Sequence, residues 1–201
     1  MPVIECHLLE GYSADEKRRL GEVLTDATRL VVPAPAELVT VMIHDMPASN
    51  YYRGRTVRVP AAAMPDPCEI VKSFLTHLGN RELDEARRFT GPGFLMFFPA
   101  TGAMQSFDEL IEWSRTRYQH IEKTIEGIEA VHSGSEAIVV YCRGMLAGTW
   151  VNGNRFDDVR FIDRFELIDG KIVKQEVWND LGEMMREANV NGGQSSEELP
   201  V

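Results

Sequence analysis

The residue with the clearest chemical potential is Pro2, which directly follows Met1. A small second residue permits removal of an initiator methionine, which would leave proline as the first residue. The proline nitrogen is then a secondary amine, and burial in an apolar pocket or a neighbouring cation lowers the pKa of such an amine. An amine tuned in this way acts as a general base near neutral pH. With Met1 still attached, the same nitrogen is a tertiary amide and cannot be a base.

A second group of candidate residues centres on Asp163. Phe161, Asp163 and Phe165 alternate along a stretch with strand character, so they share one face of it. A carboxylate between two phenylalanines is costly to bury unless it is paired or functional. In an apolar cavity the pKa of such an acid rises, and the acid can donate or accept a proton. Two interpretations stay open: a pocket acid, or a structural acid paired with Arg143 or another arginine.

Three more residues are candidates for lining the same pocket. Tyr141 and Arg143 share one face of their predicted strand, and Trp178 belongs to the last predicted strand. We treat them, together with Asp163, as second-pocket candidates.

The elements around Pro2 form a predicted βαβ unit. Residues 2–9 have strand character, and Ser13 with Glu16 has the spacing of a helix-capping box. Apolar residues then recur at helical spacing as far as Val31, and the β-branched residues 38–44 predict a second strand. We therefore expect a first domain over residues 1–58 and a proline- and alanine-rich linker over residues 59–65.

The rest of the chain predicts an α+β domain over residues 66–187. Asp66 and Pro67 have the spacing of a helix start. Two helices, a strand and a third helix are followed by four strands, with hairpin signals at Asn152-Gly153 and Asp169-Gly170. This order predicts a curved antiparallel sheet over helices. Residues 188–201 are polar and predict a disordered tail.

Composition excludes several classes of function. The 201 residues carry a net charge of −10, which disfavours nucleic-acid binding. The three cysteines form no CxxC pair, and the histidines show no HxxxH spacing, so we expect no metal. The sequence contains no GxGxxG motif and no P-loop, and we expect no organic cofactor. No apolar run is long enough to span a membrane, and the first 15 residues carry acids instead of a basic segment. We expect a cytoplasmic protein with a small-molecule substrate.

The stretches PVIECHLLEGYSADEKRRL and PAELVTVMIHDM resemble the 4-oxalocrotonate tautomerase family over roughly residues 2–55. The resemblance implies a βαβ subunit that pairs into a four-stranded sheet, commonly within trimers of dimers. It implies that Pro2 is the base that moves a proton between carbon and oxygen in keto–enol isomerisation. Some relatives instead use a protonated proline to dehalogenate or decarboxylate small acids.

The resemblance also suggests which residues surround Pro2. The family member that acts on a dicarboxylate has arginines at the positions of Tyr12 and Thr40. Both hold carboxylates there through a contact that only a guanidinium makes, so a dicarboxylate bound in that manner is not expected here. Tyr51 matches the family's site-lining aromatic residue, and His44 shares strand parity with Thr40 and could face the same site.

Replacement cations for the missing arginines lie in the loop just beyond Tyr51. They are Arg53, Arg55 and Arg58. The alternative is that all three are solvated loop charges.

The helix order and the stretch RFIDRFELIDGKIVKQEVWND resemble the SnoaL-like branch of the NTF2-like fold. This resemblance spans residues 66–187 and implies a cone with a deep pocket, often dimeric. The branch includes polyketide cyclases, ketosteroid-isomerase-like enzymes and pocket proteins without a known reaction. Catalytic residues vary too much across this fold to be transferred to particular positions.

The sequence supports three functional hypotheses. The first is a tautomerase that uses Pro2 on a small enolisable carbonyl acid. The second is a SnoaL-like isomerase or cyclase with Asp163 as base and the βαβ unit serving assembly. The third is a ligand-binding protein without catalysis. A βαβ unit of this size buries little surface and has open sheet edges, so we expect a homo-oligomer, either a hexamer or a dimer.

Overall fold

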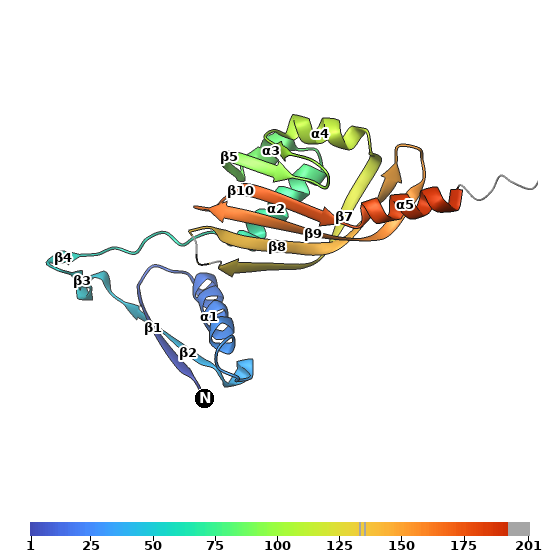
Figure 1. The fold of residues 1–201 in the computed structure, drawn as a ribbon. Helices are drawn as coiled ribbons and strands as arrows, with labels where there is room; N and C mark the ends of the chain where they lie inside the picture. Colours follow the sequence, from blue (N-terminus) through green and yellow to red (C-terminus); the bar gives the residue numbers. More distant parts are fainter. Residues whose placement is uncertain (133, 135, 193–201) are drawn as a thin grey trace, which may run out of the picture. The chain divides into compact units, whose positions relative to one another are not determined.

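The computed structural model describes residues 1–132, 134 and 136–192. The chain divides into two compact units, Met1–Met64 and Pro65–Val201. Figure 1 shows a small βαβ unit and a larger unit built on a curved sheet. Each unit is described by itself.

The first unit is the predicted βαβ arrangement. Strand β1 (Val3–Leu9) leads through helix α1 (Ala14–Arg29) and the short helix η1 (Ala36–Leu38) to strand β2 (Thr40–Met46), which pairs with β1 in parallel. The capping box is confirmed, because the Ser13 hydroxyl accepts from the Glu16 N–H at 3.3 Å and the Glu16 carboxylate accepts from the Ser13 N–H at 2.7 Å. The short helix η2 (Ala48–Asn50) and the strands β3 (Tyr52–Arg53) and β4 (Thr56–Val57) follow.

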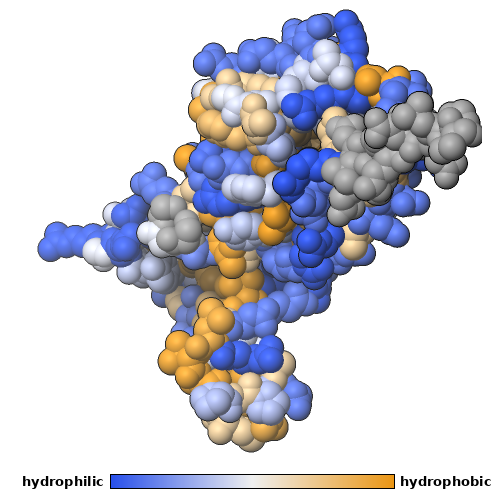
Figure 2. Space-filling view, turned by 45° about the vertical axis from the view of Figure 1, so that its right-hand side comes forward, coloured by the Kyte–Doolittle hydropathy of each residue, from blue (hydrophilic) through white to orange (hydrophobic). Residues whose placement is uncertain are grey.

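The first unit has no fully buried side chain. All of residues 1–64 are described, and even the helix α1 buries none of its residues completely. Large apolar side chains lie open instead, among them Leu30 and Val31, which are 88% and 84% exposed. Orange atoms reach the surface in the lower part of Figure 2, where this unit lies. The two-stranded sheet also has unpaired edges. This unit therefore leaves apolar surface and backbone groups available for association.

The second unit is an α+β domain with a six-stranded sheet in the order β6-β5-β10-β9-β8-β7. Its helices are α2 (Pro67–Gly79), α3 (Leu83–Arg87), α4 (Phe107–Arg115) and α5 (Leu181–Gly192). Its strands are β5 (Thr90–Phe97), β6 (Ala103–Met104), β7 (Tyr118–His132), β8 (Ile138–Trp150), β9 (Arg155–Ile168) and β10 (Lys171–Asn179). Helices α2, α3 and α4 lie against one face of the sheet (Figure 1).

Two features differ from the prediction. The sheet is mixed and not purely antiparallel, because β5 pairs with β10 in parallel. This pairing is not visible in a local pattern, since the two strands are separated by three other long strands in the sequence. Helix α5 extends to Gly192, so residues 188–192 are helical and not part of a disordered tail. The remainder of the predicted tail, residues 193–201, lies outside the described residues.

The core of the second unit lies between the sheet and the helices. Phe74 of α2 is completely buried, and its ring lies 5.9–6.1 Å from the rings of Phe94, Phe107 and Phe165. Burial of one such side chain contributes about 1.5–3 kcal/mol to folding. No helix in the described part of the chain is both long and apolar enough to cross a membrane.

Candidate functional site

Pro2 lies immediately before β1, at the N-terminal end of the two-stranded sheet. Its carbonyl accepts a hydrogen bond from the Thr40 N–H at 3.1 Å, so the starts of both strands meet there. Pro2 is half-buried and shares strand parity with Ile4 and Cys6, the half-buried side of β1. Of the predicted site residues, only Thr40 is brought to the same end of the sheet.

The other predicted residues of this site lie at the opposite end. Tyr12 follows β1, and Tyr51 follows β2 and η2. Because the strands are parallel, both positions are at the C-terminal end of the sheet, and seven residues at about 3.3 Å each separate the two ends by roughly 20 Å. Strand β3 lies beyond this end (Figure 1). It contains Arg53, and Arg55 follows in the turn; both residues are exposed. A single chain therefore does not bring these four residues to Pro2.

His44 lies on the face of the sheet that does not carry Pro2. It pairs with His7 across the two strands, and the two imidazole rings stack with centroids 4.9 Å apart. Both residues are exposed, and Glu5 approaches His7 Nε2 at 4.0 Å on the same face. Thr40 has the same parity, as predicted, but the position of His44 along β2 separates it from the Pro2 end.

Asp163 lies on the inner face of the second unit between Phe161 and Phe165, as the strand alternation predicts. It is completely buried. Its Oδ2 accepts hydrogen bonds from Lys123 Nζ and, at 3.1 Å, from Gln175 Nε2. The interpretation that Asp163 pairs with Arg143 is wrong, because its cationic partner is Lys123 of β7.

The other second-pocket candidates lie on the opposite face of the sheet. Cys142 is the residue directly across from Asp163, so its neighbours Tyr141 and Arg143 point to the outer face. Trp178 pairs with Ile162 and is 51% exposed. The expectation that these three residues share a pocket with Asp163 is therefore corrected. The physical reason is that a shift of one residue in register transfers a strand's side chains to the other face.

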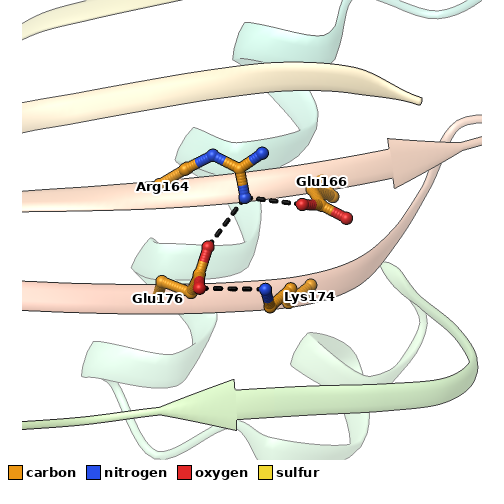
Figure 3. Close-up of polar contacts among 4 residues, drawn as sticks. All are labelled: Arg164, Glu166, Lys174 and Glu176. Atoms are coloured by element: carbon orange, nitrogen blue, oxygen red, sulfur yellow. Dashed lines mark hydrogen bonds and ion pairs between the residues drawn. The ribbon is translucent and has the colours of Figure 1, made fainter. Parts of the chain in front are cut away.

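A charged network occupies this outer face (Figure 3). Arg164 Nη1 donates to Glu166 at 2.6 Å and to Glu176 at 2.7 Å, and Lys174 Nζ lies 2.9 Å from Glu176. Burial raises the pKa of Glu176, but the hydrogen bonds from Lys174 and Arg164 outweigh this and hold the pKa below its ordinary value. Tyr141 of β8 also hydrogen-bonds Arg164. We interpret the network as structural, because its charged groups are paired with one another.

Sequence reasoning missed Lys123 and Gln175. Gln175 is 1% exposed, although the residue type is usually found at the surface. The available signal was its alternation with Val177, a buried residue two positions further along the same strand. Lys123 stands in a charged stretch, and only the fold shows that it reaches Asp163. Burial, with a contribution from Asp163, raises the pKa of the neighbouring Cys142 thiol to about 11, which disfavours the reactive thiolate.

One hollow of the second unit contains none of the predicted site residues. A hollow of about 450 Å³ between β5 and the start of α4 is lined by residues that include Phe94, Ser106 and Phe107. Among the described residues, no cluster of three or more His, Cys, Asp or Glu side chains could hold a metal ion.

Comparison with known proteins separates the two units. The family model described as tautomerase enzyme matches residues 2–58. A probable tautomerase of Streptococcus mutans is 38% identical over 52 residues, which are 26% of this chain and 85% of that protein. A probable tautomerase of Streptococcus agalactiae is 36% identical over 52 residues, which are 26% of this chain and 87% of that protein.

The second unit resembles solved structures of NTF2-like proteins. An NTF2-like protein of Burkholderia thailandensis matches with a TM-score of 0.50 and 19% identity, covering 62% of this chain and 98% of that one. A SnoaL-like polyketide cyclase, so described, of Jannaschia matches with a TM-score of 0.47 and 22% identity, covering 59% of this chain and 88% of that one. The first of these likenesses shows the fold of the second unit. The match at residues 2–58 shows the family: the chain belongs to the tautomerase family.

Proposed function

We propose that the protein is an isomerase in which the amine of Pro2, exposed by removal of Met1, acts as general base on a small enolisable carbonyl acid. The observation that carries the proposal is the family match, which begins at Pro2 and spans the whole βαβ unit. The structure is compatible with this role, because Pro2 directly precedes β1 and is anchored through its carbonyl, which leaves the nitrogen free of the strand pairing.

The proton balance of this reaction is simple. The amine takes a proton from the carbon next to the carbonyl, the C–H electrons form a carbon–carbon double bond, and the carbonyl oxygen becomes an enolate. The same oxygen or another carbon then takes a proton back. The developing negative charge needs a hydrogen-bond donor or a cation close by. Neither a redox partner nor a covalent cofactor is required for this balance.

A second copy of the chain would complete this site. Pro2 and Tyr51 occupy opposite ends of one sheet. A sheet from a second copy in antiparallel orientation would bring the partner's Tyr51 to the end that carries Pro2. The partner's Arg53 and Arg55 would then supply the cation. The absence of buried side chains in residues 1–64 and the open strand edges favour such an assembly. A dimer is the smallest assembly that satisfies this requirement, and a hexamer also does.

The test combines intact mass with an enolisation assay on untagged protein. We expect the mass of a chain without Met1 and a measurable conversion of phenylpyruvate between its keto and enol forms. Pro2→Ala should lower kcat/KM by about 10²–10⁴-fold, the range of general-base catalysis. Glu5→Gln, which changes an exposed residue of β1, should leave the activity unchanged. A retained Met1, or full activity in Pro2→Ala, would contradict the proposal.

A further inference from the structure

The inner face of the second unit contains two hydrogen-bond acceptors without a donor. Asp163 Oδ1 and Gln175 Oε1 are both buried, and neither has a hydrogen-bond partner among the described residues. The two side chains are themselves 0% and 1% exposed. A buried polar atom normally has a partner, so each unpartnered acceptor indicates a missing donor.

The orientation of the two side chains is fixed by the bonds they do make. Lys123 Nζ and Gln175 Nε2 both donate to Asp163 Oδ2. Gln175 therefore uses its amide nitrogen on Asp163 and has only its oxygen left, while Asp163 has only Oδ1 left. The pair consequently presents two free acceptors that a hydrogen-bond donor could satisfy.

The surroundings of this acceptor pair are apolar on the protein side. Phe161 and Phe165 flank Asp163 on the same face of β9, and Cys142 lies opposite it on β8. All three are buried. Lys123 forms the edge toward solvent, because its side chain is 26% exposed and its Nζ lies 4.4 Å from the centre of the Phe161 ring. Lys123 and the Phe161 ring therefore lie on the side of Asp163 that is nearest to solvent.

We propose that Asp163 Oδ1 and Gln175 Oε1 bind the hydroxyl group of a small molecule with an apolar or aromatic body, an alcohol, a phenol or an enol. The hydroxyl donates its hydrogen to the acceptor pair, and the apolar body packs beside Phe161. A carboxylate or phosphate does not fit, since it brings a negative charge and no hydrogen to two acceptors. A methyl ether of the same shape does not fit either, because it has no hydrogen to donate. This site is independent of the chemistry proposed at Pro2.

The experiment compares probes that differ only in the donor. We would titrate the full-length assembly with 4-fluorophenol, 4-fluorobenzyl alcohol and 4-fluoroanisole, and measure the dissociation constants by fluorine NMR relaxation. The wild-type protein should bind at least one of the two hydroxyl probes about tenfold more tightly than the ether, as expected for the loss of one hydrogen bond. Soaking crystals with 4-bromophenol locates the bound probe through its bromine.

Two variants test the acceptors separately. In Asp163→Asn the side-chain oxygen should still accept the hydrogen bonds from Lys123 and Gln175. The amide nitrogen then takes the place of Oδ1, so that a donor replaces the acceptor. In Gln175→Met the second acceptor is lost. Either change should reduce the preference for hydroxyl over ether to less than about threefold, from about tenfold in the wild type. Asp157→Asn, an exposed change on the same strand, is the matched control and should leave the preference unchanged.

Several outcomes would overturn the proposal. They are an equal affinity for ethers and hydroxyl probes, a preference that survives in both folded variants, the absence of binding by both hydroxyl probes at millimolar concentration, and a bound probe located away from Asp163. An ordered water that bridges Oδ1 and Oε1 and is not displaced by the probes would also overturn it. Circular dichroism verifies the fold of each variant, and the two variants can be interpreted independently if one of them does not fold.

Discussion

Pro2 and Tyr51 lie at opposite ends of the same two-stranded parallel sheet. Pro2 precedes β1 and binds the start of β2, whereas Tyr51 follows the end of β2. Within one chain, Tyr51 therefore does not reach Pro2. If both residues serve one site, that site contains Pro2 of one copy and the partner's Tyr51.

This relationship predicts complementation between two inactive variants. Pro2→Ala and Tyr51→Ala should each lower the tautomerase activity of the homogeneous protein. When the two chains are refolded together, random pairing into symmetric dimers creates mixed assemblies with one intact site, and we expect recovery of about a quarter of the wild-type activity. The measurement is the phenylpyruvate assay before and after mixing. No recovery, with mixed assemblies verified by native mass spectrometry, would mean that Tyr51 does not act across subunits.

Cys142 should be almost inert toward alkylating reagents. Burial raises the pKa of its thiol to about 11, and at pH 8 only about one thiol in a thousand is then ionised. The residue is also inaccessible, with 0% of its surface exposed. We expect iodoacetamide to label Cys142 at least 100-fold more slowly in the folded protein than in urea. Peptide mass spectrometry follows the label, with the unfolded protein as control, and equal rates in both states would contradict the burial of this thiol.

The outer-face network should make stability depend on acid pH. The pKa of Glu176 lies below its ordinary value of 4.5 in the folded protein, so its contribution is present above pH 4.5 and is lost as the pH falls through the lower folded value. Glu176→Gln should cost about 1 kcal/mol near pH 7 and progressively less below pH 4.5.

Urea unfolding followed by tryptophan fluorescence measures this effect, because all three tryptophans, Trp113, Trp150 and Trp178, are in the second unit. Glu112→Gln on the exposed face of α4 is the control. A cost that stays constant between pH 7 and pH 3.5 would show that the ionised form of Glu176 is not favoured by folding.

Gly144 should not tolerate a side chain. A Cβ atom there would lie 1.9 Å from the Thr124 carbonyl oxygen on β7, where the pairing of β7 with β8 is interrupted by a bulge. A backbone carbonyl cannot move aside by rotating about a side-chain bond. Gly144→Ala should therefore lower the free energy of unfolding by about 3 kcal/mol or more. Gly79→Ala meets no atom within 4 Å and should change the stability by less than about 1 kcal/mol. Unfolding in urea compares the two variants, and similar values would show that β7 and β8 are farther apart than described.

Local patterns in the sequence predicted most of the elements. The capping box of Ser13 and Glu16, the N-cap at Asp66 and the hairpin turns were all found where expected, because caps and turns depend on neighbours in the chain. The alternation around Asp163 also predicted the face on which it lies. Helix α5 and the short strand β6 were missed, since neither has a strong local signal.

The sequence by itself determined the two kinds of unit, the position of Pro2 at the start of a strand, and an inward-facing acid at Asp163. Only the tertiary structure decided which side chains meet. Lys123 reaches Asp163 across 40 positions of the chain, while Arg143 is turned away by the register of β8. The parallel pairing of β1 and β2 likewise separates Pro2 from Tyr51. The physical reason is that periodicity and turn chemistry act over a few residues, whereas register and strand direction are set by packing between distant segments.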